Sequence, residues 1–150
     1  MSSITATPAA FTAVSDAVES RRAAFVAYLE TLSARGDFAR HFTDEVSFTV
    51  VGGPEARGRD AVEATIRAIH EQMFDSRMLV RATVVEPGRA IAELTFVGTH
   101  VGDFMGIAPT GRQVEVPYGA AYDFTDDGRI EAIRVYFPMH LLMAQLGAGA

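Results

Sequence analysis

The stretch that decides the fold reads Phe96-Val97-Gly98-Thr99-His100-Val101-Gly102-Asp103-Phe104-Met105-Gly106-Ile107-Ala108-Pro109-Thr110-Gly111-Arg112. It has the pattern of an apolar strand that runs into a loop rich in glycine and proline, and a second strand leaves that loop at once. A single histidine, His100, and a single aspartate, Asp103, stand where the first strand ends. The stretch therefore predicts two connected strands with polar side chains at their open end.

The segments around this stretch predict an α+β domain. Apolar residues fall at helical spacing over residues 15–34 and 60–73, and shorter helices are predicted over 37–42 and 139–146. In the helix over 60–73 the buried stripe consists of Val62, Ile66, Ile69 and Met73. Strand-like segments occupy residues 46–51, 77–85, 90–100, 112–124 and 129–137. Helices followed by a meandering sheet indicate an α+β fold with antiparallel strands.

Length and composition bound the possible functions. A chain of 150 residues suits one domain, which we expect over residues 14–147, with a flexible arm over 1–13 and a frayed tail over 148–150. The absence of cysteine excludes thiol chemistry, and all 13 basic residues are arginine, which excludes lysine Schiff bases. No apolar run predicts a membrane span and no secretory signal is visible, so a cytoplasmic protein is expected.

Other classes of partner find no support in the sequence. The arginines are scattered and the net charge is −6, so no nucleic-acid surface is expected. The four histidines lack the spacing of a metal site, so we expect neither a metal nor another cofactor.

Alternation along two strands predicts the lining of an interior pocket. In residues 90–100 the inner set ends at His100, a candidate general base or hydrogen-bond donor. A histidine there could instead cap the loop through a backbone carbonyl, and the pattern leaves both readings open. In residues 112–124 the inner set carries two phenols in an apolar row: Val114, Val116, Tyr118, Ala120, Tyr122 and Phe124.

Three motifs resemble those of the SnoaL-like polyketide cyclases, a family within the nuclear transport factor 2 and ketosteroid isomerase superfamily. They are residues 96–112, Gly128-Arg129-Ile130 and Gln145-Leu146-Gly147, and the resemblance covers roughly residues 28–147. It implies a cone-shaped α+β fold in which a curved, mixed or antiparallel sheet wraps around N-terminal helices and encloses a hydrophobic pocket. These motifs are specific for the family and weak for the reaction.

The resemblance also assigns the faces of the last strand. The family places its pocket-facing residues on the set that contains Pro138, so Arg134 and Tyr136 are expected to point inward. The other set would form an apolar outer face through which family members commonly dimerise, and it consists of Ile133, Val135 and Phe137. The opposite parity would place Arg134 in solvent, near Glu115 or Asp123.

The chain departs from the family at the positions that usually carry acid and base. The family aspartate, eight residues after the isoleucine of Gly-Arg-Ile, maps to Pro138, and a common histidine maps to Ala120. The base of ketosteroid isomerases maps to about Val50. The site has therefore migrated to other residues, or the reaction depends on shaping the substrate with little proton transfer, or the protein binds a lipophilic molecule unchanged.

We expect a small cyclase or isomerase that acts on a bulky hydrophobic, polyketide-type intermediate of secondary metabolism such as antibiotic biosynthesis. In this hypothesis Arg134 and a phenol of Tyr118 or Tyr122 polarise a carbonyl, and His100 transfers any proton. The resemblance makes Tyr28 a further donor, although plain core packing explains it equally well. The residues expected to contact substrate are Tyr28, Phe96, Asp103, Met105, Val116, Ala120, Phe124, Tyr136 and Pro138. The alternatives are a non-catalytic lipophilic binding protein and a structural dimerisation module.

Overall fold

The computed structural model describes residues 8–148, with side chains from Asp16 onward. Its elements in chain order are α1 (Pro8–Ser33), the 3-10 turn η1 (Phe38–His41), β1 (Phe42–Val50), β2 (Glu55–Arg57), α2 (Arg59–Arg67), the π-helical turn η2 (Ala68–Met73), β3 (Phe74–Val85), β4 (Arg89–His100), β5 (Gln113–Phe124), β6 (Ile130–Tyr136) and α3 (Met139–Gln145).

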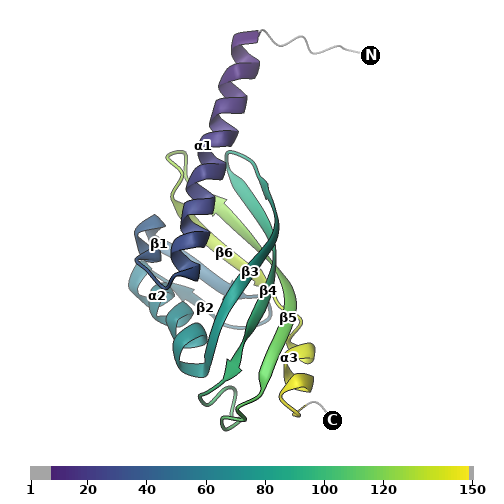
Figure 1. Cartoon of the computed structure of the whole chain (residues 1–150). Helices are drawn as coiled ribbons and strands as arrows, with labels where there is room; N and C mark the ends of the chain where they lie inside the picture. Colours follow the sequence, from purple (N-terminus) through teal and green to yellow (C-terminus); the bar gives the residue numbers. More distant parts are fainter. Residues whose placement is uncertain (1–7, 149–150) are drawn as a thin grey trace.

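The strands form one curved sheet in the order β2-β1-β6-β5-β4-β3. Strands β1 and β6 pair in parallel, and all other pairs are antiparallel, so the sheet is mixed. Figure 1 shows the long helix α1 crossing the sheet, α2 beside β1, and α3 next to β5 at the far end. The predicted α+β fold, with a curved sheet wrapped around helices, is confirmed.

Helix α1 begins at Pro8, earlier than the predicted start at Ser15. Residues 8–13 of the predicted flexible arm are therefore helical, because proline suits the first turn of a helix and the alanines that follow favour its continuation. Residues 1–7 of that arm, and residues 149–150 of the predicted tail, lie outside the described residues. None of the helices within residues 8–148 is long and apolar enough to cross a membrane.

The helix predicted over residues 60–73 occurs in two parts. Val62 and Ile66 are buried on α2, as their spacing predicts. After Arg67 the backbone continues as the π-helical turn η2, whose backbone hydrogen bonds span five residues instead of four. The wider turn brings Ile69 and the neighbouring His70 onto the same inner side.

Strands β4 and β5 follow the predicted alternation. Their inner side chains are buried, including Leu94, Phe96, Val116 and Tyr122. The predicted turn at Asp127-Gly128 connects β5 to β6, and Gly128 adopts a φ of 87°, which favours glycine. The inner faces of β4 and β5 therefore form the floor of the core.

Candidate functional site

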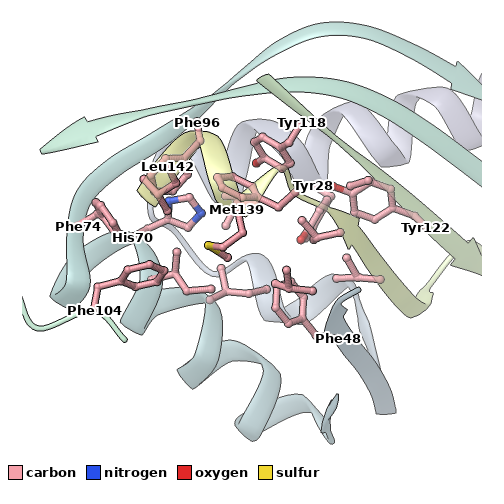
Figure 2. Close-up of a pocket in the computed structure, with 18 residues that line it drawn as sticks. Tyr28, Phe48, His70, Phe74, Phe96, Phe104, Tyr118, Tyr122, Met139 and Leu142 are labelled. Atoms are coloured by element: carbon pink, nitrogen blue, oxygen red, sulfur yellow. The ribbon is translucent and has the colours of Figure 1, made fainter. Parts of the chain in front are cut away.

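A cavity of about 120 Å³ lies between the inner face of the sheet and the helices. Figure 2 shows its residues projecting from the surrounding elements toward one space. The lining consists of Tyr28, Leu32, Phe48, Val50, Ile66, Ile69, His70, Phe74, Phe96, Phe104, Tyr118, Ala120, Tyr122, Ile133, Val135, Phe137, Met139 and Leu142. The predicted internal pocket is therefore present and strongly aromatic.

Three of the protein's phenols line this cavity. Tyr28 comes from α1 and Tyr122 from β5, with ring centroids 6.0 Å apart, while Tyr118 packs 5.2 Å from the ring of Phe137. Burial raises the pKa of all three phenols, and the neighbouring phenols raise that of Tyr122 further. The three hydroxyls therefore keep their protons near neutral pH and can donate hydrogen bonds to an oxygen within the cavity.

His70 supplies the one imidazole among the described lining residues. Its Nδ1 lies 2.8 Å from Oγ of Ser76, and its ring lies 5.5 Å from that of Phe96. Burial, helped by the nearby Arg35 cation, lowers the pKa of His70 to about 4. The imidazole is therefore neutral at pH 7. Figure 2 shows it on the side of the cavity near Phe74, with Tyr28 and Tyr122 on the opposite side.

His70 was not predicted as a site residue, although the sequence carries a signal for it. Val62, Ile66 and His70 are spaced four residues apart, so His70 continues the buried stripe of α2. The apolar stripe predicted for residues 60–73 includes its neighbour Ile69 but not His70, whereas in η2 both side chains line the cavity.

Among the described residues, the lining contains no carboxylate, guanidinium or ammonium group. Burying an unpaired ionic group in such surroundings costs several kcal/mol. The cavity therefore favours a neutral, largely apolar ligand that presents hydrogen-bond acceptors to the phenols. The part of the chain that the structure describes has no cluster of three metal-ligating side chains.

The structure separates the predicted residues of β5 into two groups. Tyr118, Ala120 and Tyr122 line the cavity, as does Phe96 on β4. Val116 and Phe124 point to the same inner side and are buried, but they pack in the core outside the lining.

His100 points inward as predicted, but it does not line the cavity. It is 0% exposed, and the backbone N–H of Thr110 donates to its Nδ1 over 3.1 Å. Its ring lies 5.2 Å from Phe74, which separates it from the cavity. The geometry matches the loop-capping alternative, except that Nδ1 accepts from a backbone N–H rather than donating to a carbonyl.

The loop after His100 lines the cavity through an unexpected residue. Phe104 is part of the lining, whereas its predicted neighbours Asp103 and Met105 are exposed, Met105 by 68%. The loop is anchored because the backbone N–H groups of Val101 and Gly102 both donate to the carbonyl oxygen of Met73, over 3.1 and 2.9 Å.

The expected orientation of β6 is wrong. Ile133, Val135 and Phe137 line the cavity, so they do not form the predicted apolar outer face for a dimer. The prediction rested on an inward position for residue 138, but Pro138 lies outside the lining, and the alternation along β6 continues to Phe137, which faces the cavity.

Arg134 and Tyr136 consequently lie on the outer face of the sheet. The two terminal nitrogens of Arg134 donate to Asp123 over 2.8 and 3.0 Å, and these bonds lower the pKa of Asp123. Tyr136 is 53% exposed. Pro138 is half-buried at the start of α3, outside the lining, between the lining residues Phe137 and Met139.

A family model described as SnoaL-like polyketide cyclase matches residues 22–146. The chain therefore belongs to the SnoaL-like polyketide cyclase family. No curated protein matches the chain in sequence.

Solved structures share the fold at low sequence identity. A candidate SnoaL-like polyketide cyclase from Jannaschia sp. CCS1 superimposes with a TM-score of 0.78 at 16% identity, covering 97% of this chain and 99% of that one. A candidate polyketide cyclase from Xanthomonas campestris pv. campestris gives 0.74 at 22%, covering 87% and 98%. SalBIII, an epoxide hydrolase/cyclase-like enzyme with a role in pyran ring formation in salinomycin, gives 0.70 at 16%, covering 82% and 94%.

Replacing Arg134 by Met tests its position on the outer face. We expect the free energy of unfolding to fall by about 1 kcal/mol, the usual scale for a partly exposed, two-bond ion pair. Urea unfolding measures this loss, and Arg89→Met, which removes only a 3.2 Å contact to Asp123, should cost less. A loss of ligand binding in Arg134→Met at unchanged stability would contradict the assignment.

Buried His70 should make stability depend on pH. In the unfolded chain His70 has its ordinary pKa of 6.5 and binds a proton below that pH, whereas in the folded protein it binds a proton only below about pH 4. The free energy of unfolding should therefore fall between pH 6.5 and pH 4, by up to about 1.4 kcal/mol per pH unit. Urea unfolding of wild type and His70→Leu isolates this contribution, and parallel curves for the two proteins would refute it.

Proposed function

We propose that this chain is a small cyclase or isomerase that acts on a hydrophobic, oxygen-bearing compound of the polyketide type in secondary metabolism. The observation that carries the proposal is the convergence of three phenol hydroxyls and a neutral imidazole on one otherwise apolar cavity. Donors fixed in a water-poor site stabilise negative charge that develops on a carbonyl oxygen during reaction.

The size of the cavity limits what it encloses. Its volume is about 120 Å³, and an apolar cavity of roughly 150 Å³ binds benzene. We infer that the cavity holds about one six-membered ring, so that a bulky substrate inserts only its reacting part. A substrate folded to the size of one ring has its reacting carbon and oxygen atoms held close together, which lowers the barrier to ring closure.

The proposed reaction is closure of a ring onto a carbonyl group. Tyr28, Tyr118 or Tyr122 donates a hydrogen bond to the carbonyl oxygen and polarises it. An enol oxygen or enol carbon of the same substrate bonds to the carbonyl carbon, the enol proton leaves, and the former carbonyl oxygen takes a proton to become a hydroxyl. The new bond closes the ring, and the hydroxyl then leaves as water together with a hydrogen of the adjacent carbon, which the neighbouring carbonyl group acidifies enough for loss to water. No external reactant is needed.

A non-catalytic lipophilic binding protein is the second candidate. The observation in its favour is the absence of any carboxylate from the lining within the described residues. Without a carboxylate the cavity lacks a strong base for removing a proton from carbon. The same phenols would then only orient a bound ketone.

Heptane-2,4,6-trione is a suitable test substrate because it closes to a single six-membered ring. Closure through its enol oxygen gives 2,6-dimethylpyran-4-one, and closure through carbon gives 5-methylresorcinol. We expect wild type to accelerate ring closure over buffer, and each of Tyr28→Phe, Tyr118→Phe and Tyr122→Phe to lower kcat at least about 10-fold. Chromatography of the two products measures the rates.

Tyr136→Phe is the matched control, because it makes the same chemical change on the outer face, where Tyr136 is 53% exposed. It should retain the wild-type rate. An equal loss in this variant would contradict a role for the cavity phenols. Binding of 2,6-dimethylpyran-4-one with no acceleration of its formation would favour the lipophilic binding protein.

A further inference from the structure

His70 forms a hydrogen bond with a buried serine of β3. Ser76 is only 4% exposed, and its Oγ lies 2.8 Å from Nδ1 of His70. Among the described residues, this imidazole nitrogen is the one hydrogen-bond partner of the hydroxyl. If Ser76 donates to Nδ1, one bond satisfies both groups. The Ser76 backbone favours an N–H on this side of the imidazole, since it raises the pKa of His70. If Nδ1 carried the proton, however, the buried hydroxyl proton would lack an acceptor, at a cost of about 1–3 kcal/mol.

A cation fixes the backbone around this pair. One terminal nitrogen of Arg35 donates to the carbonyl oxygens of His70 and Ser76, each over 3.1 Å, and to Asp75 over 2.6 Å. Arg35 thus ties the turn η2 to strand β3 at the residues that form the serine–histidine bond. Its positive charge also opposes protonation of the imidazole. The imidazole is therefore neutral and carries a single proton, on either Nδ1 or Nε2.

The close approach of two strands sets the position of Ser76. Ser76 pairs with Gly98 of β4 in the sheet register. A Cβ on Gly98 would lie 2.6 Å from the carbonyl oxygen of Asp75 and 2.7 Å from Cα of Ser76, and it would also collide with the Ser76 side chain. Only glycine at position 98 allows β3 to approach β4 this closely. Gly98 therefore sets the position of Ser76, and with it the distance from Ser76 to His70.

We infer that Ser76, placed by Gly98, is a positioning residue that holds the His70 proton on Nε2, so that the imidazole presents an N–H group to the cavity. The inference rests on the proposed function and deepens it. The cavity then offers three phenols and one imidazole N–H that can each donate a hydrogen bond, and its imidazole offers no free lone pair as a base.

A cavity without a free imidazole lone pair restricts the substrate class. A substrate whose C–H proton must be removed by the protein would find no base among the lining side chains described here. A β-dicarbonyl compound exists partly as its enol in water, so it brings its own nucleophile and needs only a polarised carbonyl. We therefore assign β-dicarbonyl compounds that close through the enol oxygen as the substrate class, and the trione should give mainly 2,6-dimethylpyran-4-one.

Nitrogen NMR of protein labelled with ¹⁵N-histidine reads the proton position directly, because protonated and bare imidazole nitrogens resonate far apart. Loss of one set of signals in His70→Asn assigns His70. His100 provides an internal reference, since its Nδ1 accepts from the backbone N–H of Thr110, which places its proton on Nε2, a buried atom without a partner among the described residues. We expect His70 in wild type to show the same pattern.

Three variants separate positioning from general damage. Ser76→Ala and Gly98→Ala should convert the His70 signals to a mixture of both proton positions, whereas Ser76→Thr keeps a hydroxyl and should keep the wild-type pattern. In the trione assay we expect Ser76→Ala to lower kcat about 3- to 10-fold with KM little changed, less than the ~100-fold cost of deleting a donor outright.

A proton on Nδ1 of His70 in wild type would overturn the inference, as would an unchanged spectrum in Ser76→Ala. Predominant formation of 5-methylresorcinol would overturn the assigned substrate class. Because the spectrum needs no substrate, it decides the placement of the proton even if wild type closes no ring. Failure of the proposed function is thereby distinguished from failure of this inference.

Discussion

Burial of the polar groups in the cavity wall is the constraint on which the rest of the site depends. The same burial raises the pKa of the phenols of Tyr28, Tyr118 and Tyr122 and lowers that of the His70 imidazole. These opposite shifts have one result, since every polar group in the lining is neutral near pH 7. A site built in this way acts through oriented dipoles rather than charges, and its strength depends on how completely the curved sheet and the helices keep solvent out.

The sequence predicted the parts of the fold in which side-chain periodicity is uninterrupted. Strands β4 and β5 are each 12 residues long, and alternation correctly assigned Phe96, Tyr118 and Tyr122 to the interior. Prediction failed where it depended on a single assumption. The family places residue 138 inward, but Pro138 lies outside the lining, so counting back from it reversed the faces of Arg134 and Tyr136. His70 lies four residues after Ile66 and lines the cavity beside Ile69, but a search for apolar residues alone passes over a histidine.

Family membership and structural likeness contribute different kinds of information. Structures with 16–22% identity share the curved sheet, because the fold requires an apolar inner face and few particular residues. Chemistry depends instead on which lining positions carry polar atoms. In this chain Ala120 is part of the lining and Pro138 lies beside it, while the polar atoms come from one helix, one strand and the turn η2. Function therefore has to be inferred from this lining rather than transferred from relatives.

The carbonyl oxygen of Met73 has a consequence beyond local geometry. It ends the turn that carries His70, and it also accepts both backbone hydrogen bonds that anchor the loop carrying Phe104. The position of Phe104 in the cavity wall and the alignment of the imidazole thus depend on the same carbonyl oxygen. A change that moves this loop to enlarge the cavity should also disturb the imidazole, so we expect enlargement to be better tolerated at lining residues on other elements, such as Phe48 and Val50 of β1.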